Sequence, residues 1–303
     1  MRTLLKTLKW AGVALVAALA VLFLAAVVLY FRGGARFNRL YDLQVADVPI
    51  PTDEAAIARG RHLAEAVTLC NACHGEDLGG TVIMDGPNIA TIVASNLTSG
   101  RGGVGRTYAD VDYVRAIRHG VNRDGRGLMI MHSDAYHRLG RDDLAAIVAY
   151  VKSVPPVDRE NPPTRGAALG RVLLALGLFD MEAMPLFPAE VIDHAAPLAE
   201  TPPPGVTPEY GQYLASIALC AMCHGSDFKG APPIEEGAPP GPNIAVYGLD
   251  DAWSEDQFIT AIRTGTTPYG RPLNPEAMPW QIYGRMTDDE LRAIRRYLAM
   301  FGN

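Results

Sequence analysis

The stretch CNACHGEDLGG, residues 70–80, places two cysteines and a histidine within five residues. A Cys-x-x-Cys spacing occurs in zinc sites, in redox-active dithiols and at sites of covalent haem attachment. The local spacing therefore leaves three kinds of chemistry open. The surrounding sequence has to distinguish them.

The motif belongs to a duplicated unit, because five blocks of sequence recur in the same order. Residues 70–75 (CNACHG) match 220–225 (CAMCHG), GPNIA occurs at 86–90 and 241–245, and AIRHG at 116–120 matches AIRTG at 261–265. The other two pairs are the segments that begin at Tyr136 and Tyr283, and the segments 144–150 and 291–297. Blocks that recur in this way indicate two copies of one structural unit.

Each unit shows apolar residues at helical spacing before the motif, in its middle and near its end. Helix N-caps are predicted at Thr107, Thr207, Ser254 and Thr287. Ser254 and Thr287 carry Gln257 and Glu290 at the reciprocal position of a capping box, and Asp110 after Thr107 is a near match. No segment shows convincing strand alternation. We therefore expect an all-α protein with four parts: an N-terminal membrane anchor (1–39), a first helical domain (40–155), a Pro-rich linker with a short apolar helix (156–206) and a second helical domain (207–303).

The N-terminal segment is the candidate for crossing a membrane. The 22 residues from Trp10 to Phe31 carry no charge and would span about 33 Å as a helix. A cleaved signal peptide has a shorter apolar core that ends in a small-x-small site, whereas this core ends in Leu29-Tyr30-Phe31-Arg32. The sequence therefore predicts an uncleaved anchor. Basic residues balance on its two flanks, so charge alone does not orient it.

The rest of the chain is acidic. Residues 40–303 contain 21 basic and 33 acidic residues, a net charge of −12, although the whole chain has a formal charge of −6. Nucleic-acid binding needs a basic footprint, so this balance argues against it. An acidic body is suited to docking on basic partner surfaces.

The duplication selects one of the three chemistries. A four-Cys zinc site needs its two Cys-x-x-Cys halves close together, but each half here lies in its own unit, 150 residues from the other. Thioredoxin-like chemistry needs a strand–helix pattern that is absent from the sequence. Both motifs continue directly into histidine, and Cys-x-x-Cys-His is the attachment signature of c-type haem. Residues i, i+3 and i+4 share one helix face, so we predict two covalent haem c groups, held by Cys70, Cys73 and His74 and by Cys220, Cys223 and His224. This attachment takes place outside the cytoplasm, which places both domains there, in a bacterium on the periplasmic side of the inner membrane.

With both motifs in place, the two units resemble class I cytochrome c domains from about residue 54 to the end of the chain. The arrangement is similar to that of membrane-anchored cytochrome subunits of periplasmic alcohol and gluconate dehydrogenases, which often carry three haem domains where this chain has two. The resemblance implies a shell of three to four helices around each haem. It also implies that the carbonyls of Pro87 and Pro242 accept a hydrogen bond from the Nδ1 atoms of the haem-ligating histidines.

The resemblance also indicates the sixth iron ligands. In the second unit, Met278 in the segment EAMPW occupies the family's usual Met-Pro position. In the first unit, alignment of Tyr136 with Tyr283 places Met131 opposite Met278, and His132 and Met129 remain as alternatives. A thioether ligand would give a higher reduction potential than a second imidazole.

Two further features have more than one interpretation. Arg118 and Arg263 recur on the middle helices, where they could pair with haem propionates or face solvent. The apolar run Val172 to Phe179 in the linker is expected to be a helix packed across the domain junction, with contact to a partner subunit or to the membrane surface as the alternatives. The triplet Asn96-Leu97-Thr98 fits a glycosylation acceptor, which no other feature supports.

An iron with both axial positions filled by protein has no open position for substrate, so its chemistry is outer-sphere electron transfer. The sequence therefore predicts a membrane-anchored dihaem carrier and not an enzyme. Its donor would be a periplasmic dehydrogenase or quinol-oxidising complex, and its acceptor would be respiratory. The alternatives are a peroxidase-type or dehydrogenase-type haem enzyme with a labile sixth ligand in the first domain, and a subunit that mainly tethers a partner complex.

Overall fold

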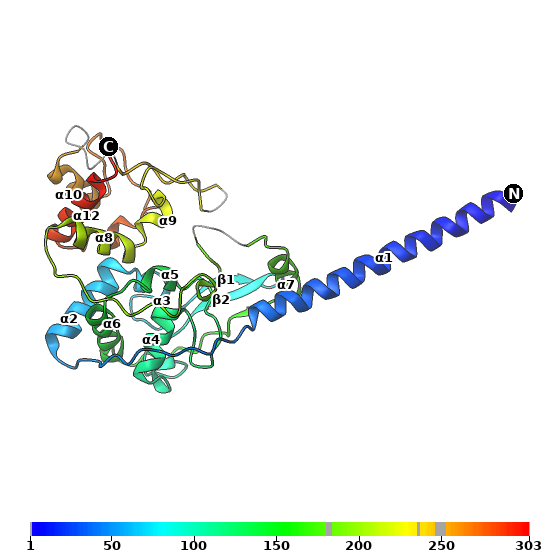
Figure 1. Ribbon diagram of the computed structural model, residues 1–303, viewed down its shortest axis with the longest axis horizontal. Coiled ribbons are helices and arrows are strands. Elements are labelled where there is room, and N and C mark those ends of the chain that lie inside the picture. Colours follow the sequence, from blue (N-terminus) through cyan, green and yellow to red (C-terminus); the bar gives the residue numbers. More distant parts are fainter. Residues whose placement is uncertain (1, 180–183, 235–236, 246–252, 303) are drawn as a thin grey trace.

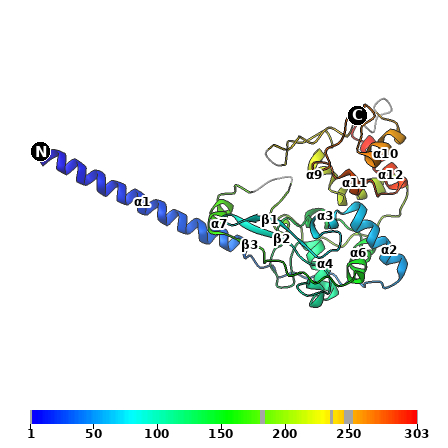
Figure 2. The same cartoon turned by 180° about the vertical axis from the view of Figure 1, so that it is seen from behind.

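The computed structural model describes residues 2–179, 184–234, 237–245 and 253–302. A single long helix, α1 (Arg2–Phe37), projects from a globular part that contains the rest of the described chain (Figures 1 and 2). This helix is long enough and apolar enough to cross a membrane, and none of its most apolar stretch is covered by other parts of the protein. The described chain is mostly helical, as expected.

The two units have matching helices. In the first, these are α2 (Glu54–His62), the π-helical turn η1 (Leu63–Val67), α3 (Cys70–His74), the 3₁₀ turn η2 (Val104–Arg106), α4 (Asp110–His119), α5 (Ser133–Tyr136) and α6 (Arg141–Ser153). In the second, they are α8 (Pro208–Ile217), α9 (Cys220–His224), α10 (Glu255–Thr264), α11 (Trp280–Tyr283) and α12 (Asp288–Ala299). The predicted caps at Thr207, Ser254 and Thr287 are confirmed, and the last two form complete capping boxes. The predicted cap at Thr107 is wrong, because α4 begins two residues later, with Ala109 as its N-cap.

A close helix crossing organises each unit. The helix before the haem motif packs on the last helix, α2 on α6 and α8 on α12, at a glycine. A Cβ on Gly60 would lie 1.8 Å from the Ala146 carbonyl oxygen, and one on Gly211 would lie 2.0 Å from that of Ala293. The segment from Gly60 to Cys70 is one residue longer than the segment from Gly211 to Cys220. The π-helical turn η1 accommodates this extra residue.

A small sheet in the first unit departs from the expected all-helical pattern. Strands β1 (Thr81–Gly86) and β2 (Ala90–Ala94) form an antiparallel hairpin, and β3 (Arg165–Gly166) pairs with β2. The sequence showed no alternation here because three consecutive residues of β1, Val82 to Met84, are all apolar and all exposed, by 44–46%. In the described part of the second unit the corresponding segment makes only the isolated bridge Ala231↔Gly241.

The linker helix α7 (Ala168–Ala175) packs on the end of α1 and on the hairpin, and not across the junction of the two haem-motif domains (Figures 1 and 2). The expectation of a junction helix was therefore wrong. Gly33 permits the contact, because a Cβ there would lie 1.8 Å from the Arg171 carbonyl oxygen. Farther along the linker, the 3₁₀ turn η3 (Pro188–Glu190) is tied to α1 by an ion pair between Arg36 Nη2 and Glu190 Oε2, at 2.7 Å.

The two domains meet through equivalent elements. Asp143 and Glu290 occupy matching positions at the starts of α6 and α12, and both are at least 96% buried. Glu290 accepts from His62 Nε2 at 2.7 Å and from Arg59 at 3.3 Å, both from α2 of the other domain. Asp143 in turn accepts from Tyr213 of α8, at 2.7 Å. The interface is therefore close to two-fold symmetric.

Candidate haem sites

Each Cys-x-x-Cys-His motif forms a short helix whose two ends are fixed by unusual backbone conformations. The preceding residues, Leu69 and Leu219, are left-handed, with φ of 55° and 62°. The following residues, Gly75 and Gly225, have φ of 80° and 81°. A left-handed leucine costs roughly 1 kcal/mol, and its recurrence at one position in both domains marks a constrained site. Between these ends, the two cysteines and the histidine share one helix face.

None of the four cysteines forms a disulfide. Burial raises the pKa of Cys70, and burial together with the neighbouring Cys223 raises that of Cys220 to about 12. Redox dithiols and zinc-bound cysteines need depressed thiol pKa values, so these thiols have the wrong character for both. Among the described residues, no three His, Cys, Asp or Glu side chains lie close enough together to hold a metal ion. The described residues thus show neither the depressed thiol pKa that is typical of a redox dithiol nor a cluster of three candidate metal ligands.

The two motif histidines are buried and held in one orientation. His74 and His224 are 9% and 7% exposed. The Nδ1 atom of His74 donates to the Ser95 carbonyl and that of His224 to the Pro242 carbonyl, both at 2.8 Å. Burial lowers the pKa of both rings, so they are neutral, and Nε2 is the atom left with a free lone pair. A neutral imidazole with an anchored Nδ1 is a suitable iron ligand, so this donor set fits a haem.

The expected role of Pro87 is corrected by this geometry, because Ser95 takes its place. The segment Ala94 to Leu97 is the structural counterpart of residues 241–244: Leu97 N donates to Leu78 O at 2.8 Å, as Ile244 N does to Phe228 O at 2.9 Å. The GPN sequence at 86–88 instead lies at the hairpin turn, where Ile89 N bonds to Gly86 O. The inserted hairpin explains the error, since it separates the GPN sequence from the position that it occupies in the second domain.

Met131 and Met278 occupy equivalent positions. Each precedes a one-turn helix by two residues, and each accepts a backbone hydrogen bond from that helix, from Ser133 N at 2.6 Å and from Trp280 N at 2.7 Å. Both side chains are partly buried against the core. His132 takes the N-cap position of Pro279.

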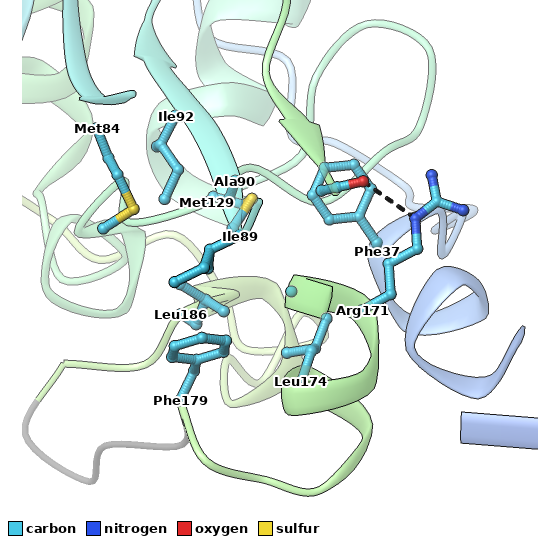
Figure 3. A pocket seen from close by; sticks show the side chains of 12 residues that line it. Phe37, Met84, Ile89, Ala90, Ile92, Met129, Arg171, Leu174, Phe179 and Leu186 are labelled. Carbon is cyan, nitrogen blue, oxygen red and sulfur yellow. Dashed lines mark hydrogen bonds between the residues drawn. The ribbon is translucent and has the colours of Figure 1, made fainter. Parts of the chain in front are cut away.

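Met129, one of the alternative ligands, lies elsewhere. Its side chain lines an apolar cavity of about 60 Å³ between the hairpin and α7, beside Ile92 and near Met84 (Figure 3). Most of the residues around it belong to the sheet, the linker and the end of α1. Met129 therefore belongs to the apolar junction with α1.

Arg118 and Arg263 bind backbone carbonyls, a role that neither interpretation of the sequence included. Arg118 is only 2% exposed, and it donates to the carbonyls of His137, Ala196 and Pro197 at 2.7–3.0 Å. Arg263 donates to the Gly284 carbonyl, the counterpart of His137, and to Asp288 at 2.7 Å. Each arginine fastens its middle helix to the loop before the last helix. Arg118 is buried there, whereas the side chain of Arg263 remains 33% exposed, in part as the solvent-facing interpretation expected.

Tyr136 and Tyr283 are site residues that sequence reasoning used only as alignment markers. Each is buried and donates its hydroxyl to a carbonyl just before the motif, that of Thr68 in the first domain and that of Ala218, at 2.5 Å, in the second. Burial raises the pKa of both phenols well above the ordinary value. Their recurrence in both units was the signal that could have identified them.

Each small helical domain carries, on one helix, a pair of thiols followed by an imidazole whose Nδ1 is anchored. These features define the class of c-type haem proteins. The Cytochrome c family model matches residues 57–155 and 208–300, one match for each unit. The chain belongs to the cytochrome c family, in which haem c is bound covalently.

Three relatives illustrate the similarity. The alcohol dehydrogenase (quinone) cytochrome c subunit of Komagataeibacter europaeus is 29% identical over 294 residues, which cover 87% of this chain and 59% of that protein. The fructose dehydrogenase cytochrome subunit of Gluconobacter japonicus is 29% identical over 82% of this chain and 53% of its own length. The gluconate 2-dehydrogenase cytochrome c subunit of Pantoea cypripedii is 34% identical, over 82% and 60%. The chain thus spans between about half and three fifths of the length of these relatives.

Proposed function

We propose that the chain is a membrane-anchored dihaem cytochrome c that carries electrons from a periplasmic dehydrogenase to a respiratory acceptor. The observation that carries this proposal is the duplicated site: a pair of thiols, a histidine with its Nδ1 fixed, and a methionine in an equivalent loop, present once in each domain. The domains are taken as residues 40–155 and 207–303, with the anchor at 1–39 and the linker at 156–206.

Each set of side chains has a defined task. The two cysteines of each motif would hold the haem as thioethers, and His74 and His224 would ligate iron through Nε2. Met131 and Met278 would supply the remaining protein ligands. The haem contributes reversible one-electron chemistry, and the protein sets its potential, burial and access. With a histidine and a methionine both bound, the iron would offer no position for a substrate, and the residues around the site would serve electron transfer.

The donor is inferred from the relatives, three of which are named as cytochrome subunits of alcohol, fructose and gluconate dehydrogenases. We therefore expect a dehydrogenase as partner. Helix α1 would hold the chain in the bacterial inner membrane, with both haem domains on the periplasmic side, where haem c is attached.

The ligand assignment is tested with the long-wavelength absorption band that a methionine–iron bond produces in the oxidised protein. We expect two haems per chain and a band of two-haem intensity. Met131→Leu and Met278→Leu should each halve the band. Met129→Leu and His132→Leu serve as matched controls and should leave it unchanged.

A full-intensity band in Met131→Leu would contradict the assignment of Met131. Carbon monoxide binding to the reduced wild-type protein would show an open iron and would contradict the carrier function. The partner is tested by mixing the oxidised protein with candidate dehydrogenases and their substrates: a partner reduces both haems, and failure of every such enzyme to do so would refute the proposed donor class.

A further inference from the structure

A surface next to the anchor consists of exposed apolar side chains from two elements. From β1 it has Val82, Ile83 and Met84, and from α7 and the turn after it Leu169, Leu176 and Leu178. All six are exposed by 44–65%. We call these six residues the collar. Exposed apolar side chains that gather on neighbouring elements indicate a binding surface.

The two parts of the collar are held together. Gly170 of α7 packs on the hairpin turn, where an added Cβ would lie 1.9 Å from the Ile89 carbonyl oxygen, and Ala167 N donates to that same carbonyl at 2.9 Å. Strand β3, which directly precedes α7, pairs with β2 at Ala90↔Gly166 and Thr91↔Arg165. The apolar cavity lies between them (Figure 3). The hairpin and α7 therefore form one packed unit.

The anchor fixes the height of this unit. Helix α7 contacts α1 at Gly33, two residues after the apolar stretch ends at Phe31. Arg171 of α7 also donates to the Tyr30 hydroxyl at 3.3 Å, and its guanidinium carbon lies 5.2 Å from the centre of the Tyr30 ring. Tyrosine and arginine at the end of an apolar helix are typical of the membrane–water boundary. Figures 1 and 2 both show α7 beside this end of α1.

The exposed charges near the collar include two arginines and one carboxylate, Asp85, which follows Met84 on β1. Arg32 and Arg165 are exposed, the first on α1 just beyond the apolar stretch and the second at the start of β3. Arginine at the edge of an apolar surface binds phosphate headgroups while the apolar side chains enter the bilayer boundary. A short apolar element that lies in this boundary beside a spanning helix adds to membrane binding.

From this placement we propose that the collar lies in the outer boundary of the phospholipid bilayer, so that the first haem domain is held against the membrane and not only tethered to it. This inference rests on the part of the proposed function that makes α1 a membrane anchor. It adds a second membrane contact, which fixes the orientation of the first domain relative to the bilayer.

The test uses the full haem-loaded chain in vesicles of phosphatidylethanolamine and phosphatidylglycerol that contain a phospholipid with a photoreactive diazirine on its acyl chain. After irradiation, mass spectrometry locates the lipid adducts. We expect adducts on α1, on residues 82–84 and on residues 176–178. Met300 and Tyr269 are comparably exposed, at 64% and 70%, but lie in the second domain, so they define the background.

A charged variant tests the surface itself. In the double variant Leu176→Asp/Leu178→Asp, adducts on both parts of the collar should fall to background while those on α1 persist. Both leucines are more than half exposed, at 54% and 65%, so the change removes little packing. The matched control Tyr269→Asp should leave the adduct pattern unchanged, and the haem absorbance reports the fold of every variant.

Two outcomes would overturn the proposal. Collar adducts at the background level, with α1 labelled, would show that the anchor spans the membrane but the collar does not touch it. The second outcome comes from a chain that carries photoreactive benzoylphenylalanine at position 176, irradiated in native membranes. Cross-links from this residue to another polypeptide instead of lipid would make the collar a protein interface. Neither result depends on the number of haems, so failure here is distinguishable from failure of the electron-carrier function.

Discussion

Arg118 brings a positive charge into the interior of the first domain. Its guanidinium donates to His137 O at 2.7 Å, on the loop before the last helix, and to Ala196 O and Pro197 O of the linker at 2.7 and 3.0 Å. Burial lowers the pKa of this arginine, and these hydrogen bonds compensate the charge. Arg263 makes the corresponding contact in the second domain, with Asp288 in place of the linker carbonyls.

We predict that Arg118→Leu lowers the free energy of unfolding by about 2–4 kcal/mol, because the variant loses several charge-assisted hydrogen bonds and leaves buried carbonyls unpaired. Arg263→Leu should cost less, since Asp288 is a largely exposed partner. Denaturant titration followed by haem absorbance measures both. Both midpoint potentials should stay at their wild-type values. A shifted potential with unchanged stability would instead assign the arginine to a haem propionate.

Residues whose side chains perform the chemistry could be predicted from the sequence, whereas partners that act through the backbone could not. The motif itself identifies Cys70, Cys73 and His74. The partner of His74 is a carbonyl, which every residue carries, so only the fold shows that it belongs to Ser95. Asn96, in the apparent glycosylation triplet, is 2% exposed and supports this same segment by accepting from Thr98 N at 3.0 Å.

At the scale of elements, the two glycine crossings hold the helix before each haem motif, α2 or α8, against the last helix of its domain. Both glycines have negative φ, so they are present for close approach and not for backbone freedom. A backbone carbonyl occupies the position that a Cβ would need in each case. The helices would have to separate to admit a methyl group.

We predict that Gly60→Ala and Gly211→Ala each destabilise the protein by about 3 kcal/mol, the upper range for overpacking, because backbone and not a movable side chain is in the way. Gly12→Ala is the matched control, since nothing lies within 4 Å of the added Cβ. Thermal unfolding of the haem-loaded chain measures the difference. Equal stability of Gly60→Ala and Gly12→Ala would show that the crossing is not tightly constrained.

Helices could be predicted well because their caps and their spacing are local. The hairpin could not, because β1 is exposed over most of its length and lacks the alternation that burial of one face produces. Its stability comes from pairing with β2, which in turn pairs with β3 some 70 residues later in the chain. The placement of α7 also depended on a contact far away in sequence, between Gly33 and Arg171.

At the scale of the whole molecule, the relation of the two domains depends on buried charges at their interface. Arg59 joins both acidic residues: it donates to Asp143 of its own domain through two bonds of 2.9 Å, and to Glu290 of the other domain at 3.3 Å. Burial alone would raise the pKa of Glu290, but His62 and Arg59 outweigh this effect, and the pKa lies below its ordinary value of 4.5. The carboxylate is therefore ionised across the neutral range.

A lowered carboxyl pKa fixes the sign of the pH dependence. The folded state binds fewer protons than the unfolded state near the ordinary pKa, so Glu290 contributes its full stabilisation above pH 4.5 and loses it as the pH falls through the lower folded value.

We predict that Glu290→Gln lowers the free energy of unfolding at pH 7 by about 1.5–3 kcal/mol, the worth of a charge-assisted hydrogen bond. The deficit should shrink below pH 4.5. Asp289→Asn, whose side chain is 70% exposed, is the control and should match wild type in denaturant titrations at both pH values. A deficit of equal size at pH 7 and in acid would show that the charge of Glu290 does not hold the domains together.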